Sequence, residues 1–347
     1  MKNKYLFVTI LLLALALTGF GFTRVYVSVG QQKEREELLI VTSFYPMYVA
    51  ALNIAGECPG VIVENLSEPQ TGCLHDYQLT PQDMILLSEA DVFVVNGGGI
   101  ETFLTDVAEK YPQLTIINAG AEIFGESSYK QGQADNEEMH DEEAEAHIHE
   151  ELHDEAAEIH VHEELHDENA HAGHNHGENA HAWMSIPHYM EQIQTICNGL
   201  QTADPLHKDI YEAAANLYLE KIEQLHQEAE TIVEAAKGKS VVIFHEAFEF
   251  LAEDLEMWIV GELNLDEERQ VSAKEVADIL NTIESEQIEM VLAEELYGKD
   301  MGDTIEKETT CKVYYLDTLV RGEENKDSWL LGMEQNLQLL KEALNVR

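Results

Sequence analysis

Two spacings of apolar residues alternate in the first third of the chain, and together they predict an α/β fold. Short runs that are apolar almost throughout are typical of strands buried on both faces. Stretches with apolar residues three or four positions apart are typical of helices. We expect strands at 38–43, 61–65, 91–96 and 115–118. We expect helices at 45–55, 81–90 and 101–110, the second beginning with Pro81 after Thr80 as a cap. This order indicates a parallel sheet covered by helices on both faces.

The same alternation returns after Gly238 and predicts a second sheet of the same kind. We expect strands at 241–244, 257–260, 290–293 and 312–316. We expect helices at 247–255, 272–285, 301–309 and 326–344. The second half of the chain therefore repeats the architecture of the first.

Between the two halves, the spacing of apolar residues predicts a helix at 184–202 and then one long helix at 205–237. A helix of that length in a globular chain usually spans two lobes. A chain of 347 residues is long enough for two domains. We therefore expect a first α/β lobe at 38–204, a linking helix at 205–237 and a second α/β lobe at 238–347.

The N-terminal segment, residues 1–30, has the pattern of a targeting sequence. Lys2 and Lys4 precede nineteen residues without charge, and Arg24 follows them. This is typical of a secretory signal or of a single membrane anchor with the remaining chain outside the cytoplasm. No cleavage site stands out, so we favour an extracytoplasmic protein tethered to the cell membrane by an uncleaved segment. The alternative is a cleaved, secreted or periplasmic protein.

A segment rich in histidine and acid, residues 135–178, interrupts the first lobe. It contains ten of the sixteen histidines and seventeen acidic residues but no Lys or Arg, and the phrase HxHEELHDE occurs in it twice. Such a polar segment cannot bury enough apolar surface to fold alone. Imidazole and carboxylate are both zinc ligands. We interpret the segment as a disordered, accessory collector or sensor of zinc, and the alternative is a passive spacer. Its candidate ligands are His147, His149, His153, His160, His162, His166, His171, His174 and His176.

The charge and the cysteines narrow the class of protein further. A formal net charge of −47 disfavours nucleic acid as a partner and favours cations. The four cysteines, at 58, 73, 197 and 311, contain no CxxC pair of the kind that holds structural zinc. Outside the cytoplasm Cys58 and Cys73 could form a disulfide, and the alternative is that they are buried thiols.

Four residues outside the acidic segment lie where a strand or loop leads into a helix. His75 and His181 precede expected helices in the first lobe, and His245 and Asp317 end expected strands in the second lobe. In open parallel sheets, ligands bind beyond the carboxyl ends of the strands. A single ion between the lobes could therefore be held from both sides. His188, His207 and His226 fall within helices and are interpreted as surface or capping residues.

The sequences around these four residues resemble the zinc and manganese solute-binding proteins of bacterial ABC importers, the ZnuA-like metal-binding lipoprotein family. The resemblance covers residues 38–347 and depends on HDYQLTPQD at His75, AHAWMS at His181, FHEAFEFLAEDLEM at His245 and YYLDTL at Asp317. It implies two Rossmann-like lobes joined by a rigid helix, with a transported metal ion in the cleft between them.

By this resemblance the metal ligands are His75, His181 and His245, with either Asp317 or water as the fourth. Family members with a carboxylate at the third position tend towards manganese, so His245 indicates Zn²⁺ as the transported ligand. Phe20 stands where a lipoprotein carries the lipid-bearing cysteine. The implied partner is an ABC permease in the membrane, and we expect a monomer that is not an enzyme.

Several alternatives remain open at the level of the sequence. The chain could be a manganese-binding homologue, a zinc buffer or adhesin, or a zinc-dependent hydrolase. A catalytic zinc ion needs an open coordination position, which four protein ligands would close, and His245-Glu246 lacks the second histidine that an HExxH motif would place four residues after His245. Glu294 and Glu295 follow an expected strand and could support the site or simply be solvated.

Overall fold

The computed structural model describes residues 37–68, 77–125, 179–263, 265 and 271–346. The chain divides into two compact units, Met1–Leu38 and Leu39–Arg347, and the fold below is that of the second unit. His75, Cys73, the N-terminal targeting segment and the acidic segment 135–178 lie outside the described residues, so the predictions made for them stay predictions. Within the described ranges, no helix combines the length and the apolar character that a membrane crossing requires.

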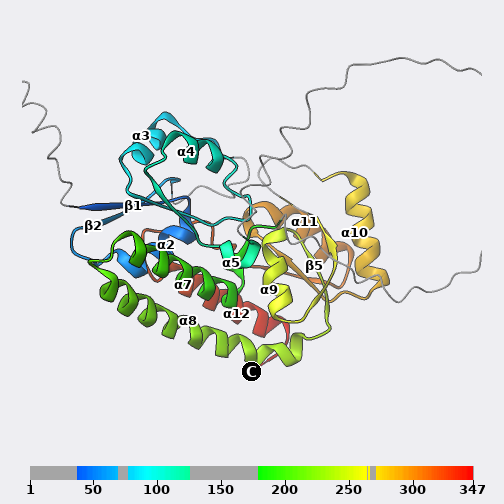
Figure 1. Ribbon diagram of the computed structural model, residues 1–347. Coiled ribbons are helices and arrows are strands. Elements are labelled where there is room, and N and C mark those ends of the chain that lie inside the picture. Colours follow the sequence, from blue (N-terminus) through cyan, green and yellow to red (C-terminus); the bar gives the residue numbers. More distant parts are fainter. Residues whose placement is uncertain (1–36, 69–76, 126–178, 264, 266–270, 347) are drawn as a thin grey trace, which may run out of the picture. The chain divides into compact units, whose positions relative to one another are not determined.

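The first lobe is built on a four-stranded sheet in the order β2-β1-β3-β4 (Figure 1). The strands are β1 (Leu38–Thr42), β2 (Val61–Asn65), β3 (Val92–Val95) and β4 (Thr115–Asn118). The pairs β1/β3 and β3/β4 are parallel. The helices are α2 (Tyr45–Ala55), α3 (Pro81–Glu89), α4 (Leu104–Lys110) and the short α5 (Ala121–Phe124). The central strand β3 is buried at every position, which explains its uninterrupted apolar sequence.

The second lobe repeats this plan with the sheet order β6-β5-β7-β8, and all of its strand pairs are parallel. The strands are β5 (Ser240–Ile243), β6 (Trp258–Glu262), β7 (Met290–Ala293) and β8 (Lys312–Tyr315). The helices are η2 (Glu246–Phe248, a 3-10 helix), α9 (Glu249–Asp254), α10 (Ala273–Ser285), α11 (Glu295–Glu308) and α12 (Ser328–Ala343). Each sheet has its own hydrophobic core. The predicted fold class is therefore confirmed.

The predicted long helix is α8 (Lys208–Ala236), which has 29 residues. It packs against α2 and α7 (Ile186–Ala203) of the first lobe and against α12 of the second lobe, and α7 and α12 lie alongside it in Figure 1. Its buried face includes Tyr211, Tyr218, Ile222 and Ile232 at helical spacing. The helix therefore contributes one apolar stripe to the packing of both lobes. The exact lobe boundaries predicted from the sequence remain untested, because Leu39–Arg347 is a single compact unit.

Local sequence explains where several helices begin. Thr80 caps α3 in a reciprocal capping box with Asp83, as the Thr80–Pro81 pair predicts, and Ser272 forms the same arrangement with Glu275 at α10. The prediction for α11 was wrong by six residues, because the helix begins at Glu295 rather than at residue 301. Gly298 lowers the helix propensity of the first turns. In the fold a Cβ at this position would lie 3.0 Å from the Ala293 Cβ, so the glycine permits close packing of α11 on β7.

A buried aromatic contact joins the two lobes next to α8. The indole nitrogen of Trp183 donates to the carbonyl of Thr318 at 2.9 Å, and that of Trp329 donates to the carbonyl of Trp183 at 3.0 Å. The Trp329 ring stacks on Tyr189 at a centroid distance of 4.1 Å. Because both indole donors are satisfied, these large side chains can be buried without an unpaired polar group. The segment around Trp183 is thus fixed against the end of β8.

The described cysteines are buried thiols. Cys58, Cys197 and Cys311 are all free in the structure, and burial raises the pKa of each thiol. Cys73 lies outside the described residues, so the pairing of Cys58 with Cys73 stays a prediction.

Candidate metal centre

The structure brings two of the four predicted ligands together from different lobes. His181 immediately precedes the 3-10 helix η1 (Ala182–Met184), and His245 follows β5 and is the N-cap residue of η2. Their rings meet edge to face, with 5.1 Å between centroids. His181 is 0% exposed and His245 is 6% exposed. Two imidazoles this close and this buried can offer two nitrogen donors to one ion.

The tautomer of His181 is set by Asn179. The Asn179 Nδ2 amide donates to the carbonyl of Glu246 at 2.9 Å and to the carboxylate of Glu249 at 2.7 Å, which fixes the orientation of the amide. Its Oδ1 atom therefore accepts, from the His181 backbone N–H at 3.0 Å and from His181 Nδ1 at 2.9 Å. A neutral imidazole that donates from Nδ1 has its lone pair on Nε2, which is the atom that a metal ion would use.

The His245 ring has the opposite arrangement. Its Nδ1 atom accepts a hydrogen bond from the backbone N–H of Ala247 at 3.0 Å. In the neutral ring the proton is then on Nε2. Coordination through Nε2 would therefore require the proton to move to Nδ1 and the contact with Ala247 to be released. The two histidines are equally buried but differ in how ready they are to bind an ion.

Carboxylates surround this pair. Glu246 Oε1 lies 3.6 Å from His181 Nδ1. Glu294, at the end of β7, is 7% exposed and pairs with Arg321 at 2.7 Å. Burial raises the pKa of Glu294, while the nearby His245 and Arg321 act in the opposite direction. Of the two readings of this glutamate pair, solvation was wrong for Glu294, whereas Glu295 is exposed.

Asp317 follows β8, as predicted; the residue is exposed, but burial of its carboxyl group raises the pKa, with the Leu319 N–H and Arg321 acting in the opposite direction. Its backbone is held by Asn336 of α12, which accepts from the Asp317 N–H at 2.8 Å and donates to the Asp317 carbonyl at 2.7 Å. The Asp317 carboxylate accepts from the backbone N–H of Leu319 at 2.8 Å. Among the described residues no group of three or more His, Cys, Asp or Glu side chains is arranged to hold a metal ion. The described part of the site is thus a pair of histidines, and Asp317 and His75 stay predicted ligands.

A buried glutamate that the sequence analysis did not identify, Glu101, is connected to the His181 segment through Asn96. Glu101 accepts from Ser43 Oγ and from the Asn96 backbone N–H, both at 2.7 Å, and from the Gly97 N–H at 3.0 Å. The Asn96 side chain then donates to the carbonyl of Ala180 at 2.8 Å. Burial raises the pKa of Glu101, and these hydrogen bonds oppose the shift. An acid two residues after the three glycines that follow β3 was the only signal for this role in the sequence.

The remaining described histidines are half-buried rather than fully exposed. His207 occupies the N-cap position of α8, as the capping interpretation predicts, and its Nδ1 atom lies 2.6 Å from Asp204 Oδ2. His188 packs edge to face on Phe250. His226 lines a cavity of about 350 Å³ between α7, α8 and α9. None of the three belongs to a metal-binding group within the part of the chain that the structure describes.

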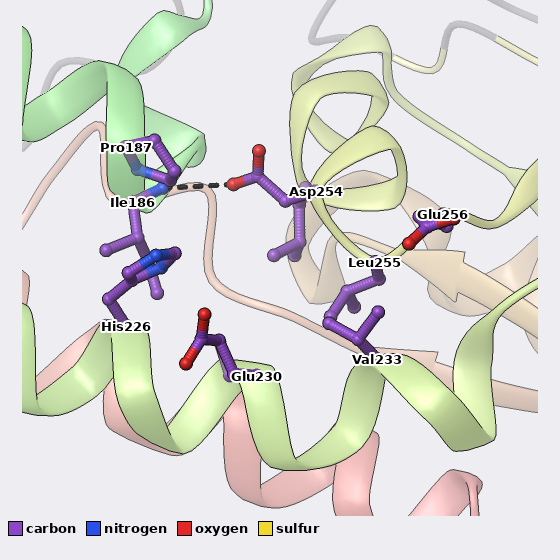
Figure 2. A pocket seen from close by; sticks show the side chains of 10 residues that line it. Ile186, Pro187, His226, Glu230, Val233, Asp254, Leu255 and Glu256 are labelled. Atoms are coloured by element: carbon purple, nitrogen blue, oxygen red, sulfur yellow. Dashed lines mark hydrogen bonds between the residues drawn. The ribbon is translucent and has the colours of Figure 1, made fainter.

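The cavity beside His226 contains a carboxylate that connects the two lobes. Figure 2 shows Asp254 bonded to the backbone of Ile186, with His226 and Glu230 reaching towards the cavity from α8 below. Asp254 accepts from Ser185 Oγ at 3.1 Å and from the Ile186 N–H at 3.2 Å, at the first turn of α7. Burial raises the pKa of Asp254 to about 6 despite these hydrogen bonds.

Comparisons with known proteins agree with this architecture. The family model described as "Zinc-uptake complex component A periplasmic" matches residues 40–343. The zinc-binding lipoprotein AdcA of Streptococcus pneumoniae is 26% identical over 327 residues, covering 91% of this chain and 58% of that protein. The high-affinity zinc uptake system protein ZnuA of Bacillus subtilis is 26% identical over 320 residues, covering 90% of this chain and 89% of that protein.

A solved structure has the same fold. The crystal structure of Zn(II)-bound AdcA from Streptococcus pneumoniae superposes with a TM-score of 0.66 at 23% identity, covering 89% of this chain and 58% of that chain. The present chain therefore spans somewhat more than half the length of AdcA. At this level of identity the superposition establishes the fold of the two lobes and not the details of the site.

Proposed function

The chain belongs to the family of periplasmic zinc-uptake components A, and from this premise we propose that it captures Zn²⁺ outside the cytoplasm and delivers it to an ABC permease. The single observation that carries the proposal is the buried pair of His181 and His245, whose rings lie 5.1 Å apart. Nitrogen donors of this kind suit zinc, and each ring comes from a different lobe. We assign His75 and Asp317 as the further ligands that complete the site.

The proposed mechanism is ligand exchange without a chemical reaction, so the protein is not an enzyme. Hydrated zinc would lose water as the neutral imidazoles bind it, and the net charge of −47 would favour the approach of the cation. Because imidazole binds a metal ion only when it is unprotonated, acid would release the ion. Free imidazole side chains protonate near pH 6.5, so we expect affinity to fall below about pH 6.

The N-terminal segment and the acidic segment 135–178 have separate roles in this proposal. The first tethers the protein to the outer face of the cell membrane, which keeps it near its permease. The second collects zinc weakly through its histidines and passes it to the main site. These are proposals that follow from the charge pattern and the repeated HxHEELHDE phrase.

Zinc titration by calorimetry tests the proposal on the exported chain, comparing wild type, His245→Ala and a variant lacking residues 135–178. We expect one tight site that is lost in His245→Ala and kept in the deletion, together with weak additional binding that the deletion removes. Tight binding that disappears with residues 135–178 and survives in His245→Ala would place the main site in the acidic segment instead. Titration with Mn²⁺ under the same conditions determines the preference between the two metals.

A further inference from the structure

The two histidine-bearing segments are tied together at both ends. One segment runs from Asn179 through His181 to the start of α7, and the other runs from His245 through η2 and α9 to Asp254. At one end Asn179 bonds to Glu246 and Glu249. At the other end Asp254 bonds to Ser185 and Ile186, as Figure 2 shows for Ile186. Asn179 of the first lobe therefore holds the segment that carries His245, and Asp254 of the second lobe holds the segment that carries His181.

Asn179 joins the positioning of both histidines in one side chain. Its amide makes four hydrogen bonds, two that fix His181 and two that fix the turn directly after His245. The residue is 5% exposed, so water cannot replace these partners without a local opening. An amide is required for this, because one end of the group must accept while the other end donates.

We propose that Asn179 is a positioning residue that fixes His181 and holds the His245 turn beside it before the metal ion arrives, so that His245 needs only its change of tautomer to complete a two-nitrogen half-site. The inference depends on the proposed function, since it concerns the same two ligands. Fixing two ligands during folding removes their ordering cost from the binding step, which raises affinity.

Three substitutions separate positioning from a general structural role. Asn179→Ala removes all four hydrogen bonds. Asn179→Asp keeps the acceptor for His181 but places a carboxylate against the Glu249 carboxylate, so it breaks the tie to the second lobe alone. Glu249→Gln supplies an amide donor at that contact, and the double variant N179D/E249Q should restore part of the tie with the two chemical groups exchanged. Asn198→Ala, on the exposed face of α7, is the matched control.

The experiment measures zinc affinity of the full chain by competition with a chelator, together with the urea unfolding of the metal-free protein. Loss of a residue that orients metal ligands typically costs about 10- to 100-fold in affinity, and we expect this for Asn179→Ala. We expect a smaller loss for Asn179→Asp and a partial recovery in the double variant. Histidine ¹⁵N spectra of the metal-free protein should show the Nδ1–H form of His181 in wild type and N179D, and lose it in Asn179→Ala.

Two results would overturn the inference. One is an Asn179→Ala protein that folds, loses the Nδ1–H form of His181 and still binds zinc with wild-type affinity. The other is a double variant that binds no better than Asn179→Asp. His245→Ala in the same series keeps the two proposals apart. If that variant retains tight binding, the proposed site itself is wrong, whereas loss in His245→Ala without loss in Asn179→Ala overturns only the positioning role.

Discussion

The two sides of the proposed zinc site differ in how far their ligands are held in position before a metal ion binds. His181 and His245 are buried and are joined through Asn179. Asp317 is exposed; Asn336 holds its backbone, and its carboxylate accepts from the Leu319 N–H. A preassembled pair selects an ion by its chemistry, and an exposed carboxylate can adjust to it afterwards. This division would allow tight capture together with release, because the exposed side can move while the buried side changes only at the His245 ring and its contact with Ala247.

The largest expected effect separates the two sides directly. Replacing His181 with Ala removes a positioned nitrogen donor, and we expect zinc affinity to fall roughly 100-fold or more, about 2.8 kcal/mol or more. Asp317→Ala should cost clearly less, since water can take the place of an exposed ligand. Chelator competition on both purified variants measures the difference. If Asp317→Ala lowers zinc affinity at least as much as His181→Ala, the two sides hold their ligands equally and the proposed difference between them is wrong.

The second prediction concerns the far end of the preassembled side, where Asp254 meets the first turn of α7. Its pKa is raised to about 6 from the ordinary value near 4, with burial as the main cause, His226 of α8 opposing the shift and Glu253 of α9 adding to it. Glu230 of α8 also faces this cavity. Because the folded-state pKa is the higher one, the folded state binds more protons between pH 4 and pH 6. The stability linked to this proton is present below about pH 4 and is lost as the pH rises through about 6.

Asp254→Asn should remove this part of the pH dependence. Relative to the variant, wild type should lose about 2 kcal/mol in free energy of unfolding between pH 4 and pH 7. Urea unfolding of the metal-free proteins across this range measures the difference. Glu256→Gln, an exposed residue that lines the same cavity, serves as the control and should leave the wild-type profile unchanged. Parallel curves for wild type and Asp254→Asn would show that Asp254 does not titrate in this way.

The sequence predicts the strands well because short apolar runs mark them, both where the strand is buried throughout, as in β3 and β7, and where it is half-buried, as in β2. Residues 61–65, 115–118 and 290–293 were predicted as strands with the bounds that the structure has. The failure at α11 has a physical cause, since Gly298 lowers helix propensity locally but is required for packing on β7. Helix propensity depends on the local sequence, whereas this packing depends on contacts that form only in the folded chain.

The candidate site was predictable only in part. His181 and His245 could be selected because they lie beside strand ends and helix starts, where ligands of parallel sheets bind. Their contact across the two lobes depends on the interface formed by Trp183, Thr318 and Trp329, which no local pattern reveals. No pattern in the sequence marked Asn179 as a residue of the site. Its role follows from four hydrogen bonds that exist only in the folded chain.

The smallest expected effect tests whether charge near the histidine pair matters beyond the ligands themselves. Glu294 and Glu295 are adjacent in sequence, but Glu294 is buried near His245 and pairs with Arg321, whereas Glu295 is exposed and lies 3.8 Å from Lys299. A buried carboxylate close to the site favours a bound cation more than a solvated one does, because water screens it less. We expect Glu294→Gln to weaken zinc binding about 3-fold, roughly 0.7 kcal/mol, and Glu295→Gln to leave it unchanged. Chelator competition at low and high salt measures both, and the Glu294 effect should persist at high salt. Equal affinities for the two variants would mean that the preassembled side gains nothing from its buried charge and depends on geometry alone.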